Sequence, residues 1–309
     1  MTVEQLAGPA VREATEFRLL GPVIVHDART GVGFAPSSPK QRALLAALVI
    51  HAGERLSVDR LVEELWGDQP PANAPNALQA HVSRLRRLLP DRGHEWISTL
   101  PTGYLLTLGH ASTDVARFSR LSAQGRTAVP EDPRHAVELL CQAIELWHGP
   151  ALLDSCRGPI CTAEADRLEE QRLTTLEALY EARLNTGSYL AVIPDLERLI
   201  ADHPLRERFY DLLMVALYRG GRQSEALGVY ESARRRLIGT LGIEPGLALR
   251  YRLEAILNHS PALTSTRPHP TSLATRVAEL QTRIEQLERA HEGMLKRCCA
   301  TEGHLKSSL

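Results

Sequence analysis

Nearly continuous helical periodicity over residues 113–259 constrains the fold of this chain more than any other feature. Alanine and leucine stripes recur there in segments of roughly 12–18 residues, which are too long for strands and typical of helices. One segment, GRQSEALGVYESARRRL, has the small–large pattern of a tetratricopeptide-like hairpin, without a strict repeat period. The region is therefore predicted to form an all-α layered array. Its segments end at the breaks VPEDP, LNTGSY, DHPLRE, YRGGRQ and GIEPG.

Residues 16–110 have a different pattern, in which short β-favouring runs and short helices follow one another. Turn sequences divide the β-favouring runs of residues 16–34, which predicts a small antiparallel sheet. Two capped helices come next. Their expected caps are Ser38, with Pro39 at N1 and Gly53 at C′, for the first, and Ser57 and Gly67 for the second. Their expected buried side chains are Leu44, Leu45, Leu48 and Val49, then Leu61, Val62 and Leu65.

The segment NALQAHVSRLRRLL, residues 76–89, predicts a third helix with two contrasting sides. Leucine and valine recur at steps of four, three and four, which gives one buried side. The other side has no carboxylate. The buried side carries Leu78, Val82, Leu85 and Leu89, and the other carries Asn76, Gln79, Ser83, Arg84 and Arg87, with His81 and Arg86 on its flanks.

Side chains of this kind suit a helix that enters the major groove of DNA. Arginine binds guanine or phosphate through two hydrogen bonds, asparagine and glutamine bind adenine, and a carboxylate would be repelled by phosphate. Only Lys40, Lys296 and Lys306 among the 36 basic residues are lysine. Arginine content alone therefore indicates little, and the placement of the arginines carries the prediction. The alternative is a solvated basic surface on an arginine-rich chain.

A hairpin is predicted directly after this helix. The segment WISTLPTGYLLTL has β-branched and aromatic residues on both sides of its PTG turn. A sheet, three helices and a hairpin, in this order, form a winged helix-turn-helix, whose hairpin lies along the adjacent minor groove or backbone. The long loop before the third helix begins at Trp66, and a single tryptophan there is more typical of a core than of a contact surface.

Three further segments lie outside these two regions. Residues 1–15 show no period and are predicted to form a disordered leader, and residues 260–272 a Pro/Ser/Thr linker. Residues 273–299 carry an apolar heptad seam, which predicts a coiled coil that pairs two copies of the chain. The seam is short and contains a histidine, so a solvated or docked tail helix is the alternative. It consists of Leu273, Val277, Leu280, Ile284, Leu287, His291 and Met294.

Composition limits the class of protein. The chain has 309 residues and a formal net charge of −1, and its apolar runs are far shorter than the ~18 residues of a membrane span. It opens without a secretory signal, and its five cysteines, without a CxxC pair, are expected to be free thiols of a reducing cytosol. The sequence contains no nucleophile elbow, no His/Cys cluster with metal-ligand spacing and no glycine-rich phosphate-binding loop. We therefore expect no enzyme, no cofactor and no metal, which leaves a DNA-binding regulator or a helical scaffold that binds other proteins.

Longer stretches of the chain resemble a known family. FRLLGP, KQRALLAALVIHAGERLSVDRLVEELWGDQPPANAPNALQAHVSRLRRLL and TGYLL resemble the OmpR-type winged helix of the Streptomyces antibiotic regulatory protein family. HPLRERFYDLLMVALYRGGRQSEAL and YESARRRLIGTLGIEPGLALRYRLEAIL resemble that family's bacterial transcriptional activation domain. The resemblance covers residues 16–258. It implies a mainly α chain, with an α+β winged helix at residues 16–110 and a tetratricopeptide-like helical domain at residues 113–259.

The same resemblance implies a cytoplasmic, nucleoid-associated activator of transcription that serves one pathway, a secondary-metabolite or antibiotic cluster. Proteins of this family bind direct repeats in promoter DNA near the −35 region. They recruit RNA polymerase holoenzyme through its sigma factor and alpha subunit. A homodimer on double-stranded DNA is the assembly that such repeats imply.

Residue by residue, the resemblance points to the third helix and to the loop before it. The loop with Trp66 and Asp68 is similar to the one that touches polymerase in OmpR-type activators. Lys40, at the start of the first helix, is expected to add a phosphate contact. The matching DNA-binding positions of the third helix are Asn76, Gln79, His81, Ser83, Arg84, Arg86 and Arg87.

The predicted wing departs from the family. Leu100 stands shortly before the Gly-Tyr pair, where family members often have an arginine that reaches into the minor groove. The DNA contacts of the wing are then expected to come from Thr99, Thr102 and backbone groups. This implies weaker recognition of the minor groove.

Overall fold

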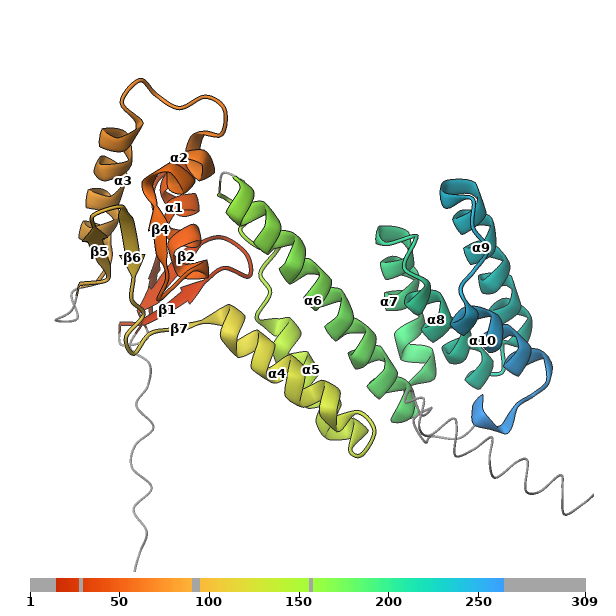
Figure 1. Cartoon of the computed structure of the whole chain (residues 1–309). Coiled ribbons are helices and arrows are strands. Elements are labelled where there is room, and N and C mark those ends of the chain that lie inside the picture. The colour runs from red at the N-terminus through yellow and green to blue at the C-terminus, as the bar shows by residue number, and fades with distance from the viewer. Residues whose placement is uncertain (1–14, 28–29, 91–94, 156–157, 264–309) are drawn as a thin grey trace, which may run out of the picture.

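The computed structural model describes residues 15–27, 30–90, 95–155 and 158–263. These residues form an elongated molecule, with a mixed α/β unit at one end and helices along the rest (Figure 1). The chain is mainly α, as predicted, and a winged helix-turn-helix precedes a layered helical domain. None of the described helices is both long and apolar enough to cross a membrane.

A small sheet opens the described chain. Strands β1 (Thr15–Arg18), β2 (Ile24–Asp27) and β3 (Val32–Phe34) pair in antiparallel fashion, which confirms the sheet predicted at residues 16–34. The sheet begins one residue earlier than predicted. Strand β7 (Ser112–Thr113) adds to it parallel to β1, so the strand order is β3-β2-β1-β7.

The first two helices begin at their predicted caps. Helix α1 (Pro39–Ile50) starts after Ser38, whose hydroxyl accepts a hydrogen bond from the amide of Gln41 at 3.3 Å. Helix α2 (Val58–Trp66) starts after Ser57, whose hydroxyl accepts a hydrogen bond from the amide of Arg60, also at 3.3 Å. Each cap satisfies an amide that has no partner inside the helix.

The end of α1 differs from the prediction for Gly53. His51 is the C-cap of the helix, so Gly53 lies beyond C′. Gly53 has a φ of +86°, and its amide donates to the carbonyl oxygen of Leu106 at 2.9 Å. This glycine therefore serves a turn that ties α1 to the hairpin and does not end the helix.

Helix α3 (Ala74–Leu88) begins two residues before its predicted start, after the N-cap Asn73. Its predicted apolar side is confirmed, since Leu78, Val82, Leu85 and Leu89 are all buried. The predicted core residues of α1 and α2 are buried too, except Val62, which is only partly buried. On α2, the residue that lies inward beside Leu61 and Leu65 is Glu64, at 1% exposure.

The predicted hairpin is present as β5 (Ile97–Leu100) and β6 (Gly103–Leu106). A third strand that was not predicted, β4 (Arg55–Ser57), pairs with β6 and gives the order β4-β6-β5. The close approach of β4 and β6 requires a glycine at position 103. A Cβ on Gly103 would lie 1.9 Å from the carbonyl oxygen of Leu56.

Seven described α-helices form the helical domain, and every break predicted from the sequence lies between two of them. Neighbouring helices pack against one another along the chain. Helix α6 has 27 residues, about 40 Å, and is longer than any predicted segment. The helices are α4 (Asp114–Ala128), α5 (Pro133–Glu145), α6 (Pro159–Asn185), α7 (Tyr189–Asp202), α8 (Glu207–Arg219), α9 (Gln223–Leu241) and α10 (Leu247–Leu257), followed by the 3-10 helix η1 (Pro261–Leu263).

The described residues form two hydrophobic cores, and the first of them extends beyond the winged helix. It includes Phe17 and Leu78 of the winged helix together with Phe118 of α4 and Leu168 of α6. The second core fills the space among α5 to α10. Helix α6 crosses both cores and runs from the winged helix toward α7 and α8 (Figure 1). The winged helix and the first helices of the helical domain therefore form one packed body.

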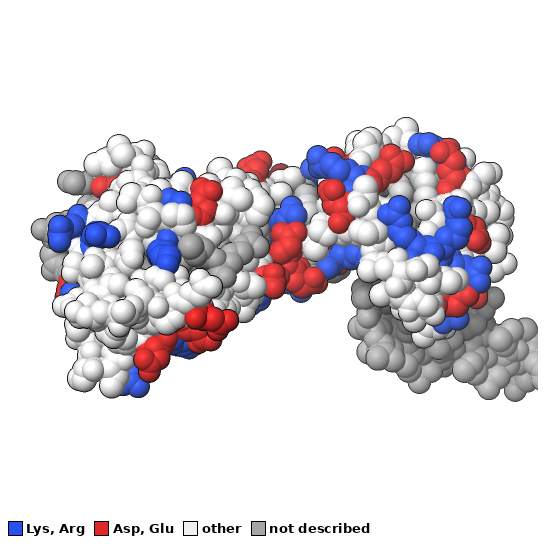
Figure 2. All heavy atoms as spheres, turned by 90° about the horizontal axis from the view of Figure 1, so that it is seen from above, with Lys and Arg blue, Asp and Glu red and all other residues white. Residues whose placement is uncertain are grey.

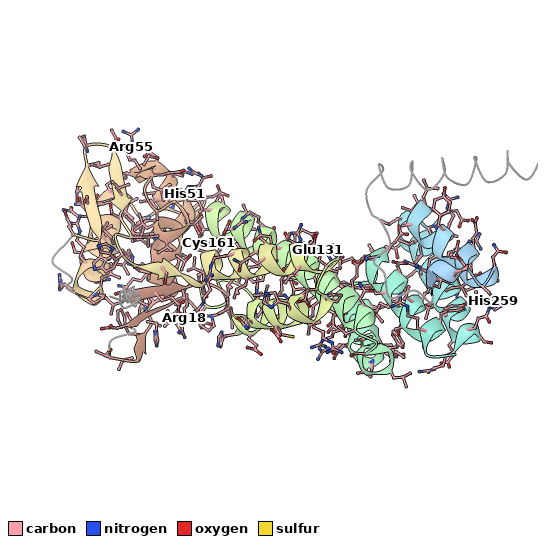
Figure 3. The ribbon with its side chains drawn as sticks, turned by 90° about the horizontal axis from the view of Figure 1, so that it is seen from below. Arg18, His51, Arg55, Glu131, Cys161 and His259 are labelled. Atoms are coloured by element: carbon pink, nitrogen blue, oxygen red, sulfur yellow. The ribbon has the colours of Figure 1, made fainter. Side chains whose placement is uncertain are left out.

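A buried carboxylate joins the winged helix to α6. Glu64 accepts hydrogen bonds from the amides of Ile160 and Cys161, at 2.6 and 3.1 Å, in the first turn of α6. Figure 3 shows Cys161 where α6 reaches the winged helix, at the opposite end of the molecule from His259. The N-cap of α6 is Gly158, which has no side chain to satisfy these amides. Glu64 therefore caps α6 from the winged helix.

A second buried carboxylate joins α4 to the first sheet. Asp114 accepts hydrogen bonds from the amides of Leu19 and Leu20, each at 2.9 Å. Burial raises the pKa of Asp114 to about 6, although these two amides act in the opposite direction. The carboxyl group therefore connects the two domains and titrates near neutrality.

We expect Asp114 to make stability depend on pH. Its pKa in the folded protein, about 6, exceeds the ordinary value of 3.8, so the folded state holds the proton more tightly than the unfolded state. The stabilisation is then complete below about pH 4 and is lost as the pH rises through about 6. Urea unfolding between about pH 4 and pH 7 should show this decline, and a flatter profile for Asp114→Asn. Parallel profiles for the two proteins would contradict it.

Several predictions concern residues at the two ends of the chain. The predicted leader, except Thr15, most of the linker and the coiled coil over residues 273–299 lie outside the described residues. At its start the linker prediction is wrong, because η1 is folded and Leu263 is buried. The Nε of Arg219 donates to the carbonyl oxygen of Leu263 at 2.7 Å. The chain is therefore anchored against α8 and α10 up to Leu263.

Candidate nucleic-acid interface

The side of α3 that faces away from the core carries no carboxylate. Asn76, Gln79, Arg84 and Arg87 are exposed on it, and Ser83 is half-buried. Among the residues that the structure describes, no carboxylate forms an ion pair with Arg84 or Arg87. Because the leucine side of the helix is fixed in the core, these polar side chains are presented outward together.

Arg86 is placed differently from its two neighbouring arginines. Its Nε and Nη2 donate to the carbonyl oxygen of Ile97, at 2.8 and 2.6 Å, and Nη2 also donates to the hydroxyl of Thr99 at 2.8 Å. The same guanidinium forms an ion pair with Glu95 at 3.2 Å. Arg86 therefore holds the hairpin against α3. Arg86 and the hydroxyl of Thr99 thus have a positioning role, and the DNA contacts expected of them from the sequence remain predictions.

Three predicted site residues meet at one end of the interface. The Nζ of Lys40 lies 5.0 Å from the centroid of the Trp66 ring. The centroids of the Trp66 and His81 rings are 5.9 Å apart. Burial lowers the pKa of His81, and the positive charges of Arg84 and Lys40 lower it further. The lowered pKa of His81 favours the neutral form of the imidazole. The half-buried Trp66 therefore contacts both Lys40 of α1 and His81 of α3.

The wing and the loop before α3 place the remaining predicted residues at the surface. Thr102 is exposed at the tip of the hairpin, and its carbonyl oxygen accepts a hydrogen bond from the amide of Val58 at 3.3 Å. Leu100, where an arginine was expected, is half-buried. Asp68 is exposed in the loop that follows Trp66. Thr102 and Asp68 are therefore free to meet a partner, and the described part of the wing offers it no positive charge.

Arginines of the helical domain are used in a different way. Arg206 and Arg208 form ion pairs with glutamates of α6, and Arg252 of α10 forms one with Asp211 of α8. Figure 2 shows blue and red side chains interleaved over the helical end of the molecule. Hydrogen bonding to Arg206 lowers the pKa of Glu170. These arginines stabilise contacts between helices, in contrast to Arg84 and Arg87.

The described residues offer no other obvious site chemistry. Among them, no group of three or more His, Cys, Asp or Glu side chains could hold a metal ion. Cys141 is half-buried and Cys161 is buried, and the two do not form a disulfide with each other. The three other cysteines lie outside the described residues.

Comparison with known proteins identifies both halves of the chain. Residues 35–106 match the family described as "Transcriptional regulatory protein, C terminal", and residues 113–257 match "Bacterial transcriptional activator domain". The transcriptional regulator RedD of Streptomyces coelicolor is 45% identical over 253 residues, which cover 80% of this chain and 72% of RedD. The chain belongs to the Streptomyces antibiotic regulatory protein family. It is a transcriptional regulator of that type.

Other relatives agree with this family assignment. The regulatory protein DnrI of Streptomyces peucetius is 34% identical over 269 residues, which cover 84% of this chain and 98% of DnrI. A solved structure of Mycobacterium tuberculosis EmbR, in complex with a low affinity phosphopeptide, has the same fold. It superposes with a TM-score of 0.75 at 33% identity and covers 88% of this chain and 71% of EmbR.

Sequence reasoning missed the two carboxylates of the domain junction. Glu64 follows Leu61 by three residues, so helical spacing already places it on the inner side of α2. Its partners lie 96 and 97 residues further along the chain and could not be identified by local pattern. Asp114 carried a weaker signal, as an acidic residue in the first turn of a helix.

Proposed function

We propose that this family member is a sequence-specific DNA-binding activator of transcription, and that α3 is its recognition helix. The observation that carries the proposal is the placement of Arg84 and Arg87, exposed and without a described carboxylate partner, on a helix whose other side is sealed in the core. Such a helix can bind phosphates and base edges in the major groove at once. Asn76, Gln79 and Ser83 supply the neutral hydrogen-bonding groups.

Affinity and specificity then come from different side chains. Arg84, Arg87 and Lys40 neutralise phosphates and release counterions, so that binding weakens steeply with salt. Base contacts from the same side of α3 add about 1–3 kcal/mol each and select the sequence. His81 is half-buried beside Trp66, its lowered pKa favours the neutral form, and it contributes a hydrogen bond to the DNA. Thr102 contacts the DNA backbone from the wing.

In this proposal, two copies of the chain bind as a homodimer to adjacent direct repeats in the promoter DNA. One winged helix reads only a few base pairs. A homodimer raises affinity because binding of the first copy increases the effective concentration of the second at its repeat. The repeats are expected near the −35 region of promoters of one secondary-metabolite pathway. The protein then acts in the cytoplasm, at the nucleoid.

The loop between α2 and α3 is the proposed contact with RNA polymerase holoenzyme, through its sigma factor and alpha subunit. Asp68 is exposed in this loop, which begins directly after Trp66. Because α2 is fixed to α6 through Glu64, the loop keeps one orientation relative to the helical domain. That orientation lets DNA and polymerase be bound on neighbouring surfaces.

Footprinting tests the proposal on the DNA that flanks the protein's own coding region. At two salt concentrations, we expect protection of direct repeats that weakens sharply at the higher salt, as counterion release requires. A helical scaffold that binds only proteins is the competing function. It would leave the DNA unprotected and would show no salt-dependent retention on random duplex DNA.

A further inference from the structure

Exposed hydrophobic side chains are concentrated at the end of the described chain. Six of its ten exposed large hydrophobic residues lie within residues 238–257. Five of them follow one another from the last turn of α9, through the loop after it, into the first turns of α10. We call these five the C-terminal strip: Ile238 (40% exposed), Leu241 (51%), Ile243 (51%), Leu247 (62%) and Tyr251 (50%).

The strip lies on the side of its helices that faces away from the second core. On α10, Leu249 and Ile256 are buried in the second core, whereas Leu247 and Tyr251, four residues apart, lie on the opposite side. On α9, Ala233 and Leu237 are buried, and Ile238 lies to one side of them. Exposed apolar side chains that are grouped in one part of a surface, and not scattered over it, are typical of a binding surface.

We propose that the C-terminal strip is the docking surface of the chain's own heptad segment, residues 273–294. This segment carries six apolar residues at helical spacing and needs an apolar partner for them. It therefore binds the strip as an amphipathic helix on a hydrophobic surface. The proposal goes beyond DNA binding and does not depend on it.

Position and reach favour this occupant. The described chain ends at Leu263, which is buried against α8 and α10, and 46 residues follow it. Residues 264–272 span up to about 30 Å when extended, whereas α10, with 11 residues, is only about 16 Å long. A tether of this length keeps the segment at a millimolar effective concentration beside the strip.

A second copy of the strip is a poorer occupant. Stable interfaces between proteins involve roughly 20–30 residues on each side. Five half-exposed side chains fall far short of that number, but they suffice for a short helix that is held nearby by its own chain. The tethered segment is therefore the partner that fits the size of the strip.

Hydrogen–deuterium exchange on the full chain tests the docking. The tail variant Leu280→Asp with Ile284→Asp removes two seam residues and should speed amide exchange in residues 247–257 by about tenfold, because a bound segment stabilises what it contacts. The strip variant Ile243→Asp with Leu247→Asp should speed exchange in residues 273–294 by a similar factor. Both strip positions tolerate aspartate, since one is in a loop and the other is at a helix N-terminus.

Leu190→Asp is the matched control, because Leu190 is 63% exposed on α7, outside the strip. It should leave exchange in both segments unchanged. Unchanged exchange of α10 in the tail variant would overturn the proposal. Sedimentation separates the main rival: a tail variant that halves the mass of the particle without affecting α10 would show that the heptad segment pairs two copies.

Discussion

Replacing Arg84 by alanine is expected to lower affinity for the promoter by about 10–100-fold, since one base or phosphate contact of this kind contributes about 1–3 kcal/mol. Arg84 is exposed on α3, whereas the preceding Ser83 is half-buried and the following Leu85 is buried in the core. The fold should persist, because Arg84 forms no ion pair with the described carboxylates. Footprint titration and thermal melting, on the same preparation, measure the two quantities.

Arg198→Ala is the control for this prediction. Arg198 has the same side chain at 71% exposure but lies on α7, near Asp195, far from the winged helix. Its loss should leave the footprint unchanged. If Arg84→Ala gave the same footprint titration as Arg198→Ala, α3 would not be the recognition helix.

The second large effect is expected at the domain junction. Glu64→Ala should lower the free energy of unfolding by about 2–4 kcal/mol, because it leaves the amides of Ile160 and Cys161 buried without acceptors. Such a loss corresponds to a fall in melting temperature of roughly 5–15 °C. Hydrogen exchange should also become faster in the first turn of α6. Calorimetry and exchange measurements check the two results.

The neighbouring glutamate is a matched control. Glu63 precedes Glu64 on α2 and is exposed, so Glu63→Ala should change stability by less than about 0.5 kcal/mol. Gly158→Ala should disturb the same junction from the side of α6, because a Cβ at position 158 would lie 2.2 Å from the carbonyl oxygen of Glu64. It should cost about 1–3 kcal/mol. Equal stability of the Glu63 and Glu64 variants would exclude the cap.

Local patterns were sufficient for most of the fold. The caps Ser38 and Ser57, the leucine spacing of α3 and the PTG turn each act within a few residues, and the structure confirms them. Strand β4 was missed because it has three residues and exists only by pairing with β6, about fifty positions later in the chain. Gly53 was misassigned because a turn glycine and a C′ glycine look alike in sequence.

The candidate site was predictable to a smaller extent. Helical spacing correctly places Gln79 and Arg84 outward, because it depends only on the period of the helix. It also put Arg86 on the flank of the same surface. The partner of Arg86, the carbonyl oxygen of Ile97, depends on the register between α3 and the hairpin, which the sequence does not reveal. For the same reason Glu64 and its α6 amides were not paired.

Photo-crosslinking tests most directly whether the acid-free side of α3 lies on DNA. A photoreactive residue at Gln79, exposed on α3, should crosslink to a labelled promoter duplex. The same residue at Gln142, exposed on α5, is the control and should give no crosslink. Crosslinking at Gln142 without crosslinking at Gln79 would contradict the account, because the duplex would then lie on the helical domain and not on α3.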